Sequence, residues 1–259
     1  MEGALSKNPF QITTPEDLTA DEMISLFVDE HTDLPKIVNP GHVFIKGPRG
    51  VGKSMLLRFL QPDCQCLYFE KELSQLDFLG IYIPLKNTNF SLTELRRLED
   101  AHACDILNEH LLTCHCCVRV FEELESLQLS KVSLEDAKKY YSDVFEPLIC
   151  NYLDCEYNIE ECESVKDVFG KIKVIITKES RTITQYLRKL AFQTRILPYS
   201  GALFDYIDFL LPLLEGLTRI EGMPKKTVYL LIDDAHCLNE TQTRVLNSWV
   251  GTRTSRKVS

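Results

Sequence analysis

The residues with the clearest chemistry form the run from Gly47 to Ser54, which reads Gly-Pro-Arg-Gly-Val-Gly-Lys-Ser. The run matches the pattern G-x-x-x-x-G-K-[ST] without a substitution. Glycines let the main chain turn closely around a phosphate group, and successive amides can then point inward as an anion-binding nest beside a helix N-terminus. The amides expected in this nest belong to Gly50, Val51, Gly52, Lys53 and Ser54.

Two side chains of this loop have roles of their own. Lys53 supplies a mobile positive charge for the outer phosphates, and Ser54 offers a hydroxyl to Mg2+. The alternative is a glycine-rich turn that contains Lys-Ser by coincidence, but an apolar run precedes the loop and a helical pattern follows it. The predicted nucleotide site also includes Gly47, Arg49 and Met55.

A second signal lies at the end of the apolar run 227–232, where Asp233 and Asp234 follow one another. A carboxylate at the end of a strand beside a phosphate loop can hold the magnesium shell, usually through water, and Asp233 is assigned that role. Asp234 is then placed to orient the attacking water. The alternative is a helix cap. His236 is interpreted as a loop residue rather than a γ-phosphate sensor.

Secondary structure is predicted from hydrophobic spacing and turn residues. Strands are expected at 42–45, 80–83 and 227–232, each a short apolar run. Helices are expected at 19–30, where Thr19 and Glu22 form a capping-box pattern, and at 54–60 and 239–250. Most of 91–221 also reads as helix, although the β-branched residues at 172–176 would suit a strand.

The composition is that of a globular protein, with 44% hydrophobic and 26% charged residues. The net charge of -9 disfavours direct nucleic-acid binding, and the basic stretches at 181–195 and 253–257 are interpreted as solvated faces. No apolar run is long enough to span a membrane. The N-terminus lacks a basic-then-apolar signal, so a cytoplasmic location is expected.

Ten cysteines without a secretion signal favour a reducing compartment and free thiols. On a helix, His110, Cys114 and Cys117 would share one face. This face is interpreted as a buried packing surface, with a metal site as the alternative. The full cluster comprises His102, Cys104, His110, Cys114, His115, Cys116 and Cys117.

The segments 43–58 and 229–236 resemble the additional-strand P-loop ATPases. Among these, the chain is most similar to AAA+ ATPases of the origin-recognition-complex type found in bacteria, and it also resembles the STAND signalling ATPases. The resemblance implies an α/β fold with a parallel-sheet P-loop core, and it places adenine contacts near Pro9 and Phe10. AAA+ members usually carry Asp-Glu where this chain has Asp233-Asp234, so the metal role of Asp233 is better supported than the catalytic role of Asp234.

Two departures from this family follow from the chain length. About 180 residues separate Ser54 from Asp233, far more than a minimal crossover needs, so a large helical insertion is predicted at 91–200. Such an insertion would contact a partner or a second copy, or would only extend the packing. The chain is thereby divided into a lead-in at 1–40, a phosphate-loop part at 41–90, the insertion, and an Asp-Asp strand part at 201–259.

The second departure concerns the sheet. The family places a further strand between the phosphate-loop strand and the Asp-Asp strand, and here it could begin only at 257–259. An arginine finger and a lid would follow later still. Because buried backbone groups without partners cost about 1–3 kcal/mol each, the sheet is expected to be incomplete at the C-terminus and the chain to be a fragment of a longer ATPase.

The function expected from these features is ATP binding and Mg2+-dependent hydrolysis that drives a conformational or assembly switch, with Lys53 and Asp234 as catalytic residues. One alternative is a nucleotide-binding regulatory scaffold without turnover. The other is a P-loop kinase, for which Arg96 and Arg97 would supply the basic lid.

Overall fold

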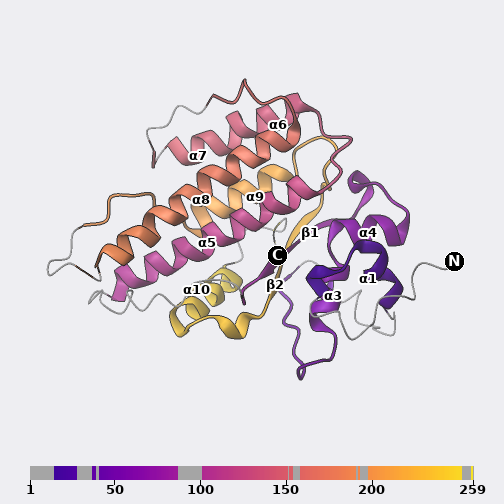
Figure 1. Cartoon of the computed structure of the whole chain (residues 1–259), viewed down its shortest axis with the longest axis horizontal. Coiled ribbons are helices and arrows are strands. Elements are labelled where there is room, and N and C mark those ends of the chain that lie inside the picture. The colour runs from indigo at the N-terminus through magenta and orange to yellow at the C-terminus, as the bar shows by residue number, and fades with distance from the viewer. Residues whose placement is uncertain are drawn as a thin grey trace.

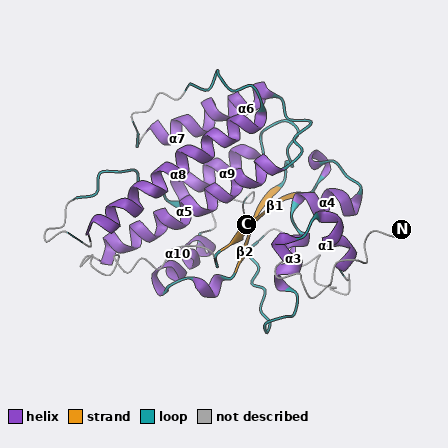
Figure 2. Ribbon diagram, in the orientation of Figure 1, coloured by secondary structure: helices purple, strands orange, loops and turns teal. Residues whose placement is uncertain are grey.

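The computed structural model describes residues 15–27, 37–38, 41–86, 101–150, 152–153, 158–190, 192, 198–252 and 258. A parallel pair of strands lies at the centre, with helices on both sides (Figures 1 and 2). The helices and strands are α1 (Ala20–Leu26), α3 (Lys53–Phe59), α4 (Pro62–Phe69), β1 (Phe78–Pro84), α5 (Ala101–Ser126), α6 (Leu134–Tyr140), α7 (Glu146–Cys150), α8 (Val165–Leu190), α9 (Leu211–Leu217), β2 (Thr227–Asp233) and α10 (Glu240–Gly251).

The strands predicted at 80–83 and 227–232 are confirmed as β1 and β2. They pair in parallel, in a register that runs from Phe78 opposite Thr227 to Pro84 opposite Asp233. Every residue of β1 is buried, as expected for a continuous apolar run covered on both faces. Their carboxyl ends therefore lie together at one edge of the sheet, where ligands of parallel sheets bind.

The sheet separates two packing environments. One face joins α3 to the strands through Leu57, Leu60, Phe78, Tyr82, Tyr229 and Leu231. The other face contributes Leu79, Ile81, Ile83 and Val228 to the large core beneath α5 and α8. Figure 1 shows this division, with α1, α3 and α4 on one side and the longer helices on the other.

Gly80 permits the close approach of α3 to the sheet. A Cβ atom at this position would lie 2.3 Å from the backbone oxygen of Leu60, at the end of α3. Any larger residue would push α3 away from β1. The helix that begins at the phosphate loop is thus fixed against the strand pair by direct backbone packing.

From residue 101 to β2, the regular secondary structure of the described residues is entirely helical. Residues 172–176 belong to α8, so the strand alternative for them is wrong. Ile172, Ile175 and Ile176 are buried together with Ile183 at helical spacing, and this packing outweighs their β propensity. The domain boundaries at 91 and 200 remain a prediction. No described helix combines the length and apolarity needed to cross a membrane.

The strand predicted at 42–45 is wrong: residues 42–48 have no regular secondary structure. Val43 is 47% exposed and Phe44 is 75% exposed, although both were expected to be buried. An apolar run becomes a strand only when a neighbouring strand pairs with it and another layer covers it. No described strand pairs with this segment, and of its apolar residues only Ile45 packs against the core of the sheet.

The helix ends predicted near Thr19 and residue 239 are confirmed. The amide of Glu22 donates to Thr19 Oγ1 at 3.3 Å, and Thr19 N donates back to Glu22 Oε2 at 3.1 Å, which completes a capping box. α1 ends at Leu26, earlier than predicted. α10 starts after an equivalent capping box at Asn239. Pro9 and Phe10 lie outside the described residues.

A further contact involves Val258, which forms a parallel bridge with Val228 of β2. Val228 also pairs with Leu79 of β1, so Val258 occupies the opposite edge of β2. This is the position expected for the further strand of the family at 257–259. Residues 257 and 259 themselves lie outside the described part of the chain.

Candidate functional site

The loop from Gly47 to Ser54 connects the irregular segment 42–48 to α3. Gly50 has φ of +88° and Gly52 has φ of +85°, a left-handed conformation that L side chains rarely adopt. Gly52 is the N-cap of α3, and Lys53 is its first residue. The two glycines therefore make the turn, and the first turn of the helix carries Lys53 and Ser54, as the sequence predicts.

The side chain of Lys53 folds across the loop. Its Nζ atom donates to the backbone oxygens of Gly47 and Pro48, both at 2.9 Å. An ammonium group has three donors, so these bonds leave one of them for another acceptor. The ammonium group of Lys53 is thus held against the loop by two exposed hydrogen bonds. An anionic group could replace these carbonyl oxygens as its partner.

The two aspartates take different positions at the end of β2. Asp233 is 7% exposed, and both of its carboxylate oxygens accept hydrogen bonds. Tyr82 Oη donates to Oδ2 at 2.8 Å, and the amide of Asp234 donates to Oδ1 at 2.8 Å. The Asp233 carboxylate is therefore buried and held in one orientation by its neighbours.

Asp234 lies in a left-handed conformation with φ of +55°. This conformation is uncommon for a residue with a side chain, although aspartate tolerates it better than most. It turns the chain from β2 directly into the short helical turn Ala235–Cys237. His236 is in that turn, with its Nδ1 atom 3.9 Å from Asp234 Oδ1 and its side chain 80% exposed. His236 also lines the cavity that the phosphate loop lines, so its assignment as a loop residue rather than a γ-phosphate sensor stays a prediction.

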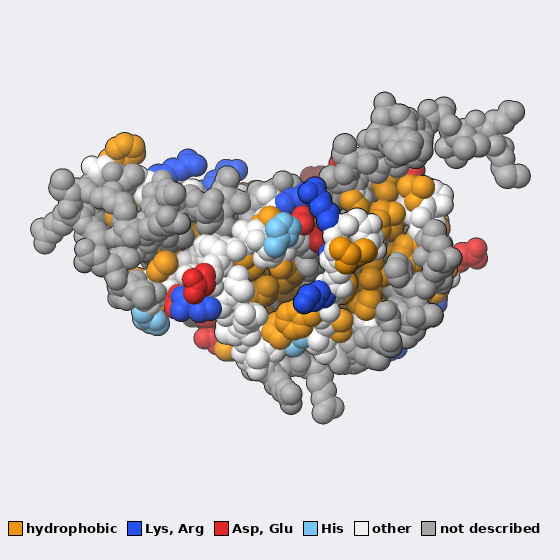
Figure 3. Space-filling model, turned by 90° about the horizontal axis from the view of Figure 1, so that it is seen from below, with side chains coloured by type: hydrophobic (Ala, Val, Ile, Leu, Met, Phe, Trp, Pro, Cys, Tyr) orange, Lys and Arg blue, Asp and Glu red, His pale blue; other side chains and the backbone are white. Residues whose placement is uncertain are grey.

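The phosphate loop and the two aspartates line the same cavity, which has a volume of about 1050 Å³. Figure 3 shows the hollowed face, with hydrophobic side chains around it and charged side chains close by. Val51 is not among the lining residues and is 45% exposed. The other predicted site residues all line the cavity: Gly47, Arg49, Gly50, Gly52, Lys53, Ser54, Met55, Asp233 and Asp234.

An aromatic pair forms part of the cavity wall and was not predicted. Tyr206 and Trp249 stack with ring centroids 5.0 Å apart and an interplanar angle of 17°. Glu109 Oε1 of α5 accepts hydrogen bonds from Trp249 Nε1 at 3.1 Å and from the amide of Tyr206 at 3.4 Å. Through this wall α10 lines the cavity, and Glu109 of α5 holds the wall in place. No local pattern marks it, because its members come from distant parts of the sequence.

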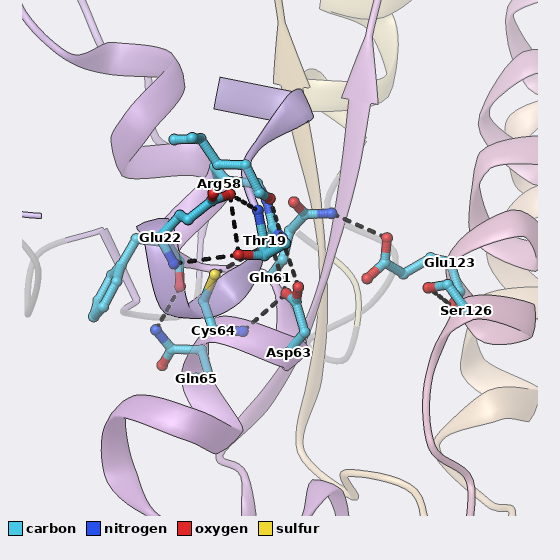
Figure 4. Close-up of polar contacts among 11 residues, drawn as sticks. Thr19, Glu22, Arg58, Gln61, Asp63, Cys64, Gln65, Glu123 and Ser126 are labelled. Atoms are coloured by element: carbon cyan, nitrogen blue, oxygen red, sulfur yellow. Dashed lines mark hydrogen bonds and ion pairs between the residues drawn. The ribbon is translucent and has the colours of Figure 1, made fainter. Parts of the chain in front are cut away.

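The C-terminal end of α3 is held by an ion pair. Arg58 forms two parallel hydrogen bonds with Asp63 of α4, each 2.6 Å long, and a third with the backbone oxygen of Leu18 at 3.3 Å. Burial raises the pKa of Asp63, but the bonds and charge of Arg58 outweigh this and leave that pKa below its ordinary value. Figure 4 shows these side chains gathered between α1, α3 and α4.

The same cluster reaches the long helices through one hydrogen bond. Gln61 Nε2 donates to Glu123 Oε2 of α5 at 3.0 Å (Figure 4). Burial, reinforced by the nearby charge of Asp63, raises the pKa of Glu123 to about 7, although Arg58 and Arg119 oppose this. The phosphate-loop helix is thus linked at its far end to a carboxyl group that changes charge near neutral pH.

Four members of the cysteine and histidine cluster, His110, Cys114, Cys116 and Cys117, are buried on α5, whereas His102 is exposed. Cys114, Cys116 and Cys117 are 0% exposed, and burial raises the pKa of each thiol. The amide of Phe204 donates to His110 Nδ1 at 2.8 Å, and burial lowers the pKa of His110 to about 4. No group of three or more metal-ligating side chains occurs within the described ranges. The packing interpretation accounts for these contacts.

Comparisons with known proteins give one result. A sequence model described as ORC-CDC6-like matches residues 8–259, which is nearly the whole chain. Neither a curated protein nor a solved structure matches the chain.

Proposed function

This chain belongs to the ORC-CDC6-like family, and we propose that it binds ATP together with Mg2+ in the cavity between the phosphate loop and β2. The observation that carries this proposal is that the loop 47–54 and the pair Asp233-Asp234 line one cavity. They are far apart in the sequence, and the Asp-Asp pair alone would be a weak signal. Membership of this family supports nucleotide binding of the AAA ATPase type.

The loop residues would hold the polyphosphate. The amides of Gly50, Val51, Gly52, Lys53 and Ser54 would provide the anion nest at the start of α3, although Val51 is not among the residues that line the cavity. Lys53 would exchange the carbonyl oxygens of Gly47 and Pro48 for phosphate oxygens. A charge-assisted bond to a phosphate is stronger than a bond to a neutral carbonyl, which favours this exchange.

The oxygen donors at the cavity suit magnesium. Ser54 offers a hydroxyl and Asp233 a carboxylate, and hard oxygen ligands are those that Mg2+ prefers. When bound, Mg2+ neutralises the developing charge on the phosphates. Asp233 is buried and already accepts two hydrogen bonds, so we assign it contact through water rather than direct coordination.

Hydrolysis would be assisted by Asp234. Its carboxylate lines the cavity and its side chain is 28% exposed, so it can accept a hydrogen bond from an attacking water. Lys53 would stabilise the charge that develops on the outer phosphate. We propose that turnover drives a conformational or assembly switch, and that the helices at 91–200 contact a partner or a second copy.

Nucleotide binding is tested with Lys53→Ala. We expect this variant to lose at least 10-fold in affinity for a fluorescent ATP analogue, because it removes the only lysine of the loop. Lys86→Ala is the matched control, since Lys86 also lines the cavity but lies outside the loop. A Lys53→Ala variant that binds as tightly as the parent would contradict the proposal.

A second candidate function is a scaffold that holds ATP without turnover. This candidate is favoured by the cavity lining. Arg49 is the one arginine among the described lining residues, and it belongs to the loop itself, so these residues include no separate arginine finger. A phosphate-release assay with Asp234→Asn as control distinguishes the two functions. Turnover by the parent that falls at least 100-fold in the variant supports hydrolysis. Binding without phosphate release supports the scaffold. Arg96 and Arg97, on which the kinase alternative depends, lie outside the described residues.

A further inference from the structure

Tyr82 is a polar residue in an otherwise apolar strand. The run Leu79-Gly-Ile-Tyr-Ile83 is aliphatic apart from this tyrosine, whose side chain is 4% exposed. A buried hydroxyl needs a hydrogen-bond partner. Its partner is Asp233 Oδ2 on the neighbouring strand, at 2.8 Å. The one carboxylate assigned to the magnesium shell is therefore held by a residue of the other strand.

The strand register explains why this contact forms. Tyr82 pairs with Leu231, and side chains alternate between the faces of a strand, so Leu231 and Asp233 share a face. That face is the one packed against α3. The long phenol ring extends one step toward the carboxyl end of the sheet and reaches Asp233. An aliphatic residue at position 82 would fill the space but would supply no donor.

The two donors together fix the orientation of the carboxylate. Tyr82 holds Oδ2, and the amide of Asp234 holds Oδ1, so the group cannot rotate without losing a bond. Each carboxylate oxygen has two lone-pair sites, and each donor uses one of them. A remaining site on each oxygen is left for a water ligand of the metal. Loss of a hydrogen-bond partner of a direct metal ligand costs about 10- to 100-fold in metal affinity. Because Asp233 contacts the metal through water, loss of its own partner should cost less.

We propose that Tyr82 is a positioning residue of the magnesium site, which it orients through Asp233. This inference rests on the proposed function. Tyr82 does not touch the nucleotide in this account; it determines how the carboxylate presents its free lone pairs to the metal-bound water. The affinity for Mg2+ in the presence of nucleotide should therefore depend on Tyr82, whereas nucleotide binding without metal should not.

The test is a titration of MgCl2 into Tyr82→Phe and a fluorescent ATP analogue, compared with the same mixture in EDTA. We expect the Mg2+ concentration for half-maximal binding to rise about 3- to 10-fold, the effect of one lost hydrogen bond, with affinity in EDTA changed by less than about 2-fold. Tyr140→Phe is the matched control. It removes the hydroxyl of a tyrosine that is 3% exposed and bonded to Leu213 O in the helical core, and it should leave the Mg2+ dependence unchanged.

A double-mutant cycle shows whether Tyr82 acts through Asp233. In an Asp233→Asn background, Tyr82→Phe should produce no further shift in the Mg2+ dependence. A shift that persists in that background, or an unchanged Mg2+ dependence in Tyr82→Phe alone, would overturn the assignment of Tyr82. A parent chain that binds no nucleotide in either buffer would instead refute the proposed function, and this inference with it. Thermal melting of each variant verifies that it is folded.

Discussion

The phosphate-loop segment 41–54 and the helical core around α5 and α8 are stabilised in different ways. In the core, Phe121, Phe169 and Ile172 are 0% exposed and lie in one continuous apolar cluster. In the loop segment, Val43 and Phe44 are exposed, and the conformation depends on two left-handed glycines and on Lys53 bonding to nearby carbonyls. The core is fixed by burial, whereas the loop is fixed by local hydrogen bonds.

This difference indicates how the two regions would respond to a ligand. A region held by a few exposed hydrogen bonds opens at little cost in free energy, whereas a buried core opens only with global unfolding. Bound nucleotide would therefore change the loop far more than the helices. Changes in the core should alter stability, and changes in the loop should alter binding.

The largest stability effect is expected in the helical core. Phe169→Ala removes a ring that packs near Phe121 and Tyr140, with ring centroids 5.9 Å and 6.1 Å away. We expect a loss of about 3–5 kcal/mol in unfolding free energy, measured by urea denaturation. Phe44→Ala in the loop segment should change it by less than about 0.5 kcal/mol, since Phe44 is 75% exposed. Comparable losses in both variants would refute the contrast.

A smaller effect is expected at the C-terminal end of α3, which lies in neither region. Arg58→Ala leaves Asp63 without its ion-pair partner, and we expect a loss of about 2 kcal/mol, limited because the Asp63 side chain is 38% exposed. The control is Arg244→Ala, which breaks an exposed pair with Asp105 and should cost less than about 1 kcal/mol. Equal chemical-denaturation midpoints for the two variants would show that the ion pair Arg58–Asp63 contributes no more to stability than an exposed pair.

The smallest effect is a pH dependence at Glu123. Its pKa is about 7 when folded and near the ordinary 4.5 when unfolded, so the folded state binds more protons between these values. Its contribution to stability is complete below about pH 4.5 and is lost as the pH rises through 7. Glu123→Gln stays neutral, so its stability relative to the parent should increase by about 1–2 kcal/mol from about pH 5 to about pH 8.

The stability of the parent alone would not isolate Glu123, because two buried histidines also make stability depend on pH. Burial lowers the pKa of His110 and His115 to about 4, which makes stability fall as the pH is lowered, in the opposite direction. Both residues are present in parent and variant, so their contributions cancel in the difference. A stability difference that is independent of pH would mean that Glu123 is not buried in the way that its bond to Gln61 implies.

Much of the site could be predicted because its signals are local. The glycines, Lys53 and Ser54 form one continuous pattern, and Thr19 with Glu22 forms another. The strand at 42–45 was predicted wrongly because pairing, not apolarity alone, makes a strand. Residues 172–176 became helix because burial at helical spacing outweighed propensity. Local patterns thus identify elements whose partners are close in sequence.

The contacts that complete the site depend on the tertiary fold. The bond between Tyr82 and Asp233 requires the register of two strands that are distant in sequence, and no spacing rule gives that register. The stacking of Tyr206 on Trp249 likewise depends on how the helical turn Tyr206–Leu210 packs against α10. Both could be anticipated only in general terms, since a tyrosine in an apolar strand must find a partner.

The central claim is that the loop 47–54 and the end of β2 form a single nucleotide site. Amide hydrogen exchange, with and without ATP and Mg2+, tests it most directly. We predict slower exchange both in the loop and in the amides that follow β2 at Asp234 and Ala235, with α8 unchanged. Protection of the loop without protection after β2, or of neither, would contradict the account.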